Sequence, residues 1–165
     1  MATASLDRPG AASSAATARL VALAAPTALL GGALLSQYVG GLHPCEMCYW
    51  QRWPHGAAIA FAVLAFLFRA GSGNATLLTV LSAVAIAVSG AIGVFHAGVE
   101  YGWWEGLTTC TASGGLSLDE LMNVPLVRCD EVQWSLMGIS MAGFNAIFSL
   151  GAAALILILL KRGRA

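Results

Sequence analysis

The stretch over residues 20–52 reads LVALAAPTALLGGALLSQYVGGLHPCEMCYWQR. Residues 20–45 carry no charged side chain, and a helix that crosses a bilayer needs about 20 mostly apolar residues. Two cysteines close this run, and a second apolar run, 53–68, begins directly after Arg52. We therefore expect a first membrane span over about 20–42, a very short connection near Cys45, and a second span over about 47–68 that carries Arg52 one turn inside it.

The rest of the chain continues this pattern. Residues 70–99 and 132–160 also lack charges, which predicts spans over about 75–97 and 135–160. Of the 165 residues, 58% are hydrophobic and 10% are charged, whereas a soluble domain carries about 25% charged residues. We expect an all-α membrane protein, an antiparallel four-helix transmembrane bundle over residues 20–160. Small residues that allow close helix contact recur at intervals of four on the last two spans. They are Ala83, Ala87, Ala91, Gly138, Ala142 and Ala146.

The charges predict the orientation of the chain. Eight basic residues balance eight acidic ones, so there is no basic surface for a nucleic acid partner. Six of the basic residues fall on one side of the four spans, and the positive-inside rule makes this side cytoplasmic. These six are Arg8, Arg19, Arg69, Lys161, Arg162 and Arg164. Both termini are then cytoplasmic, and we expect a retained, disordered tail over 1–19 and a short tail over 161–165. The outer loop 98–134 lies on the opposite side of the membrane, and so do all four cysteines, two of them in this loop and two near residue 45.

The cysteines are the candidates for chemistry. Cys45 and Cys48 form a C-x-x-C pair at the start of the second span, where the helix dipole favours a thiolate, and such a pair suits thiol exchange better than inert cross-linking. Cys110 and Cys129 lie in the long outer loop and can be structural. A zinc site is disfavoured because this second pair is widely spaced and has no histidine near it, so we expect no metal. A c-type haem would need C-x-x-C-H, and Tyr49 follows Cys48.

Arg52 is the sharpest single clue outside the cysteines. It follows Cys48 by four residues, so on a helix the two side chains share one face and the guanidinium can offset a thiolate or another developing anion. An arginine that extends toward lipid headgroups explains the same spacing. His43, His55 and His96 can serve proton transfer or simply form structural hydrogen bonds, and the sequence leaves both interpretations open.

The outer loop contains one further pattern. Ser117-Leu118-Asp119-Glu120 fits a helix capping box, apolar residues follow, and Pro125 ends the segment. We expect a short interfacial helix here, lying on the membrane surface. A solvated acidic turn is the alternative.

Three segments together resemble the disulfide bond formation protein B (DsbB) family. The run PCEMCYWQR at 44–52 is similar to the family's P-C-x-x-C-x-x-Q-R signature. HAGVE at 96–100, followed by Trp104 and Cys110, is similar to its H-x-G-V-E…W…C stretch. CDE at 129–131, followed by Trp134, GISMA at 138–142 and Asn145, is similar to its C-D-E…W…G-x-S-M-A…N segment. The resemblance covers the chain from about residue 20 to residue 160.

The resemblance implies a protein-disulfide:quinone oxidoreductase of the bacterial inner membrane. Its partners would be a DsbA-like periplasmic thiol oxidase and a membrane quinone, ubiquinone or menaquinone. It implies that Cys45 and Cys48 are the pair oxidised by quinone, with Cys48 against the ring and Arg52 assisting it. It also implies that Cys110 and Cys129 are the pair that meets the carrier, with Cys110 in the mixed disulfide. We expect the carrier to reduce Cys110–Cys129, Cys45–Cys48 to reoxidise this pair, and a Cys48 thiolate beside Arg52 to form an adduct or charge-transfer pair with quinone.

Two other classes of protein remain as alternatives. A disulfide-stapled membrane scaffold without enzyme activity needs the cysteines only as cross-links, and a haem-binding bundle that oxidises quinol needs the histidines as ligands and leaves the cysteines unexplained. A vitamin K epoxide reductase-like protein is disfavoured by order, because in that family the C-x-x-C follows the loop cysteines, whereas here it precedes them.

Overall fold

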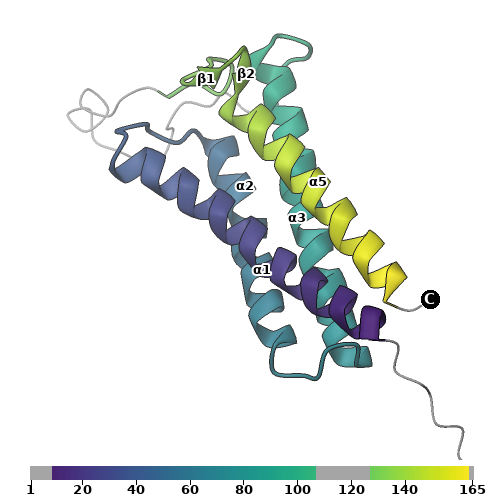
Figure 1. Cartoon of the computed structure of the whole chain (residues 1–165). Helices are drawn as coiled ribbons and strands as arrows, with labels where there is room; N and C mark the ends of the chain where they lie inside the picture. Colours follow the sequence, from purple (N-terminus) through teal and green to yellow (C-terminus); the bar gives the residue numbers. More distant parts are fainter. Residues whose placement is uncertain (1–8, 107–126, 164–165) are drawn as a thin grey trace, which may run out of the picture.

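The computed structural model describes residues 9–106 and 127–163. Four long helices pack side by side, and a two-stranded hairpin caps one end (Figure 1). The helices are α1 (Pro9–Tyr38), α2 (Glu46–Ala65), α3 (Gly73–Glu100) and α5 (Met141–Arg162), and the strands are β1 (Ser135–Leu136) and β2 (Ile139–Ser140). Helix α3 packs mainly against α2 and α5, and α1 closes the ring by contacting the same two helices.

Three of these helices are long and apolar enough to cross a membrane: Ser13–Tyr38, Gly73–Glu100 and Met141–Arg162. This agrees with the expected helical membrane protein. Helix α2, with Arg52 inside it, does not reach the same hydropathy. Helix α1 begins at Pro9, earlier than the expected boundary at residue 20. Proline suits the first helical position and the alanines that follow have the highest helix propensity, which accounts for the earlier start.

The core between the helices is built from small side chains. Ala18 and Ala22 of α1, Ala58 and Ala62 of α2, and Ala83 of α3 are buried together. Ile86 of α3 and Ala153, Ile156 and Leu160 of α5 complete this cluster. Small residues let helix backbones approach closely, which is how membrane helices gain packing energy in the absence of water.

Each predicted contact face is right at two of its three positions. Ala142 and Ala146 of α5 are buried, but Gly138 lies in the hairpin turn. On α3, Ala83 is buried and Ala87 is partly buried against the same core, but Ala91 is exposed. Polar and glycine residues share the buried face of α3 with these alanines. Ser82 donates to the Ala22 and Ala58 carbonyls, at 3.3 and 2.9 Å, so a polar side chain also binds the helices together.

The last helix begins at Met141, later than the expected position 135, because the hairpin precedes it. Met137 and Gly138 have φ values of 52° and 78°, and two consecutive positive φ angles are typical of a tight type I′ turn. Ser140 then caps α5 by accepting from the Gly143 amide at 3.1 Å. The Tyr101 hydroxyl, at the end of α3, accepts from the Ser140 amide and donates to the Gly138 carbonyl, which ties the hairpin to α3.

Two expectations lie outside the described residues. These are the short interfacial helix after Ser117 and the position of Cys110.

Candidate thiol site beside a cavity

Cys45 and Cys48 lie at the N-terminal end of α2, where Cys45 is the N-cap residue. Both are free thiols, and the Cys45 thiol donates a hydrogen bond to the Cys48 sulfur over 3.0 Å. The Cys48 amide in turn donates to the Cys45 sulfur at 3.3 Å. The hydrogen bond to Cys48 and burial raise the pKa of the Cys45 thiol. In the reduced pair Cys45 is therefore the sulfur that holds its proton, and Cys48 is the sulfur that accepts the hydrogen bond.

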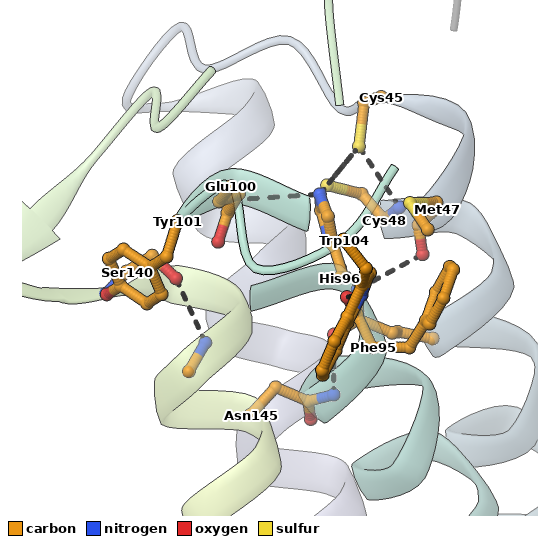
Figure 2. A network of polar contacts seen from close by, with 12 residues as sticks. Cys45, Met47, Cys48, Phe95, His96, Glu100, Tyr101, Trp104, Ser140 and Asn145 are labelled. Carbon is orange, nitrogen blue, oxygen red and sulfur yellow. Dashed lines mark hydrogen bonds and ion pairs between the residues drawn. The ribbon is translucent and has the colours of Figure 1, made fainter. Parts of the chain in front are cut away.

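His96 of α3 faces this pair, although 51 positions separate it from Cys45 in the sequence. Its Nε2 atom lies 3.5 Å from the Cys45 sulfur and 3.8 Å from a carboxylate oxygen of Glu100 (Figure 2). The ring also has a hydrogen bond with the backbone of Cys129. Glu100 is hydrogen-bonded to Ser140, and its Oε2 atom is buried without a partner.

Cys129 packs into the same end of the molecule. It forms a buried cluster with Cys45, Met47 and Val99, against which Cys48 is partly packed. Unlike Cys45 and Cys48, Cys129 is disulfide-bonded. The structure thus brings a cysteine of the outer loop against the C-x-x-C pair. Cys45 is the more deeply buried member of that pair.

Arg52 points to helix α1. Its guanidinium donates to the Gln37 side-chain oxygen and, at 3.2 Å, to the Ala33 carbonyl, and it lies over the Tyr49 ring at 5.1 Å. Two helices and an aromatic ring therefore fix the position of this charge, which differs from an arginine that extends freely to lipid headgroups.

A cavity of about 710 Å³ lies next to the thiol pair. Helices α1, α2 and α5 supply most of its wall, which is largely aliphatic and aromatic, and Cys45, Cys48 and Arg52 all line it. The other polar residues of the wall are chiefly Gln51, His55, His96, Glu100, Asn145 and, from the segment before α5, Arg128, Glu131 and Gln133. Cavities of about 300–1,000 Å³ with an apolar wall and a few polar groups are typical of sites for small organic ligands.

A buried polar network next to the cavity joins helices α2, α3 and α5. The Gln51 side chain donates to His96 Nδ1 at 2.9 Å and accepts from Asn145 of α5 at 2.7 Å. His55 contacts Asn145 and Ser89, each at 2.9 Å. Gln51, His96 and Asn145 stand in the motifs quoted above, but no feature of the sequence indicated that they contact one another, and nothing singled out Ser89.

Cys45, Cys48 and His96 also form a group whose ligand atoms all lie within 4.8 Å of one another, the spacing of a metal site. No histidine lies near the second cysteine pair in the sequence, but the fold supplies His96 to the first pair from another helix.

The comparisons with known proteins agree with this arrangement. The family model for disulfide bond formation protein DsbB matches residues 15–159. The chain is 32% identical over 159 residues to disulfide bond formation protein B of Acidovorax sp. (strain JS42), covering 88% of each chain. It is 34% identical over 158 residues to the protein of that name from Verminephrobacter eiseniae, covering 87% of this chain and 84% of the relative. No solved structure matches the chain significantly. With a match over most of its length and the C-x-x-C pair at the head of α2, the chain belongs to the DsbB family of disulfide-forming membrane proteins.

Proposed function

We propose that this protein oxidises the dithiol of a DsbA-like periplasmic carrier and passes the two electrons to a membrane quinone, ubiquinone or menaquinone. The observation that carries the proposal is the position of the C-x-x-C pair between two surroundings. Both sulfurs pack against the Cys129 cluster and both line the cavity that also holds Arg52, and Cys45 is the more deeply buried of the two. One dithiol can therefore exchange with the outer loop on one side and with a small apolar ligand on the other.

Thiol exchange in the outer loop is the first stage. A carrier thiolate attacks Cys110 of the Cys110–Cys129 disulfide, forming a mixed disulfide and releasing the Cys129 thiolate. The second carrier thiol then resolves the mixed disulfide, which leaves the carrier oxidised and the loop pair reduced. Each step forms one S–S bond and breaks one, and two electrons move from the carrier to the loop pair.

Transfer to the C-x-x-C pair is the second stage. The Cys129 thiolate attacks Cys45 of the Cys45–Cys48 disulfide, and Cys48 leaves as the thiolate. Cys110 then attacks Cys129, so Cys45 leaves in turn and the loop disulfide forms again. The packing of Cys129 against Cys45 supports this order of attack, and the hydrogen bond donated by Cys45 supports Cys48 as the charged sulfur.

The cavity fits a quinone by its size and by its donors. Cys48 and Arg52 would hold the ring, because both line the cavity, and they lie four residues apart on α2, so they share one face of that helix. A bound quinone supplies the capacity to take up two electrons and two protons. Arg52, held by Gln37 and Ala33, keeps a positive charge beside Cys48 without having to move, which favours the thiolate form of Cys48.

We further propose that all four helices cross the bacterial inner membrane as an antiparallel bundle, with both termini cytoplasmic and the cysteines on the periplasmic side. The concentration of basic residues at the opposite end of the bundle supports this orientation. Glu46, Gln51, Arg52 and His55 together lower the hydropathy of α2, and the hydrogen bonds of Arg52 to α1 reduce the cost of placing its charge there.

The test follows quinone reduction optically in detergent, with a reduced DsbA-like protein as the electron donor. Each cysteine is replaced singly by serine, and Thr27→Ala, at an exposed position of α1, is the control. We expect turnover in the wild type and the control and its loss in all four cysteine variants. Turnover by Cys48→Ser would contradict the role of Cys48 in quinone reduction. No turnover by the folded wild type with either quinone would leave the disulfide-stapled scaffold as the better interpretation.

A further inference from the structure

Two backbone carbonyls determine which atoms donate and which accept in the hydrogen bonds of the buried Gln51 and Asn145 side-chain amides. The nitrogen of the Gln51 side chain lies 3.1 Å from the Met47 carbonyl oxygen, and that of Asn145 lies 3.2 Å from the Ser89 carbonyl oxygen. A carbonyl oxygen can only accept a hydrogen bond, so each of these contacts requires an N–H donor. The remaining contact agrees, because the Gln51 oxygen then accepts from the Asn145 nitrogen at 2.7 Å.

This direction decides which nitrogen of His96 carries the proton. The Gln51 nitrogen that donates to Met47 also lies 2.9 Å from His96 Nδ1, so Nδ1 must be the acceptor. In a neutral imidazole with an accepting Nδ1, the hydrogen is on Nε2. This N–H faces the Cys45 sulfur at 3.5 Å and a Glu100 carboxylate oxygen at 3.8 Å (Figure 2), and because Gln51 occupies Nδ1, the hydrogen bond of the ring to the Cys129 backbone involves the same N–H.

We infer that Gln51 is a positioning residue that holds His96 in the Nε2–H tautomer, so that the ring donates a hydrogen bond to Cys45 and is denied to metal ions. The first part rests on the proposed function. When Cys110 attacks the Cys129–Cys45 mixed disulfide, the electron pair of the broken bond goes to the Cys45 sulfur. The Nε2–H group is already aimed at the atom on which this charge develops, and a fixed donor stabilises such a charge without reorganisation.

The second part concerns the three soft donors that the fold places together. Thiolates and an imidazole nitrogen are the ligands zinc prefers, and Cys45, Cys48 and His96 have the necessary spacing. A metal at His96 Nε2 needs the lone pair there and a hydrogen on Nδ1. That hydrogen would point at the N–H group of Gln51, which its contact with Met47 keeps in place. Gln51 therefore disfavours capture of a metal by a reduced dithiol that must remain reactive.

The substitution Gln51→Glu tests both parts. A carboxylate at this position accepts a hydrogen from Nδ1, which moves the ring to the opposite tautomer and creates the carboxylate–histidine pair that supports zinc ligands. Gln51→Met is similar in shape but has neither a hydrogen-bond donor nor an acceptor carboxylate, so it removes the preference of His96 for either tautomer. Ser149→Ala is the matched control, because Ser149 donates to Asn145 in the same network, at 2.9 Å, but does not contact Gln51 or His96 in any hydrogen bond of the described residues.

The first measurement is the ¹⁵N spectrum of histidine-labelled, full-length protein in detergent, in which the two tautomers have distinct shifts. We expect His96 to be protonated on Nε2 in the wild type and in Ser149→Ala, on Nδ1 in Gln51→Glu, and on both in Gln51→Met. A wild-type ring protonated on Nδ1, or a tautomer that does not respond to either Gln51 variant, would overturn the inference. Neither result depends on quinone reduction, so failure of the proposed function is recognised separately.

The second measurement is Cd²⁺ binding to the reduced protein, followed by thiolate absorption. Changes in the groups that orient a metal-binding histidine alter metal affinity by about 10–100-fold. We expect Gln51→Glu to bind Cd²⁺ tighter than the wild type by this factor, and His96→Gln in the Gln51→Glu background to abolish the gain. Equal Cd²⁺ affinity in the wild type and Gln51→Glu would contradict the role of Gln51 against metals.

Discussion

The substitution Gly93→Ala should weaken the contact between α3 and α5. A methyl group at this position would lie 3.0 Å from the Ala142 carbonyl oxygen and 3.1 Å from the Ala146 amide nitrogen. Both are backbone atoms of α5, so a rotamer change cannot relieve the contact. Carbon needs about 3.5 Å, so α5 must retreat by roughly 0.5 Å. Overpacking of this kind costs about 1–3 kcal/mol.

The assay is thermal unfolding in detergent, and the control is Gly151→Ala. At 2–4 °C per kcal/mol for a chain of about this size, the midpoint of Gly93→Ala should fall by about 2–12 °C. Gly151 lies on α5 with open space around the added methyl, so its replacement should leave the midpoint unchanged or raise it, because alanine favours a helix by about 0.8–1 kcal/mol over glycine. A Gly93→Ala midpoint equal to that of Gly151→Ala would refute the close approach of the two helices.

Two further predictions concern the site. Arg52→Met removes the charged donor that the proposal places against quinone. One hydrogen bond to a charged group is worth about 1.5–3 kcal/mol, so the KM for quinone should rise about 10–150-fold, with a smaller rise for Arg52→Lys. An unchanged KM in Arg52→Met would separate Arg52 from the cavity ligand. The raised pKa of Cys45 means that the native state favours its protonated form, so its contribution to the stability of the reduced protein is complete below about pH 8.5 and is lost as the pH rises above that value. Unfolding midpoints of the wild type and Cys45→Ala at several pH values measure this, and parallel profiles for the two proteins would contradict it.

The helices could be predicted because a membrane leaves few alternatives. Backbone groups in lipid must be satisfied within the segment, so long charge-free runs become helices. The ends of the helices depend on local turn and capping residues, and a prediction from hydropathy alone is wrong where the two signals disagree. The apolar run that includes Trp134 and Leu136 continues without a charge into α5, but Met137 and Gly138 form a turn first, and Ser140 caps the helix after it. Local turn chemistry therefore overrides hydropathy at this boundary.

The inward face of α3 could not be predicted from small residues alone. The search for alanines at regular spacing assigned Ala91 to the interface, whereas Ser82, Ser89 and Gly93 are buried there. In lipid there is no hydrophobic gain in burying alanine, and a serine that meets a carbonyl of another helix satisfies a group that lipid cannot. Ser82 and Ser89 do this with carbonyls of α1 and α2. The polar residues of this span, together with alanines such as Ala83, mark the interface.

The site shows why the spacing of cysteines identifies a dithiol but not how it works. Cys45 and Cys48 share one helical turn, so their proximity is local and readable from C-x-x-C. Their surroundings are not local: Cys129 comes from the outer loop, His96 from α3, and most of the cavity wall from α1 and α5. One turn of α2 therefore places both sulfurs between a buried cluster that contains another cysteine and a cavity, with Cys45 the more deeply buried of the two. Because disulfide exchange passes electrons between adjacent sulfur atoms, this single turn is sufficient to connect the two without any large movement of the helices.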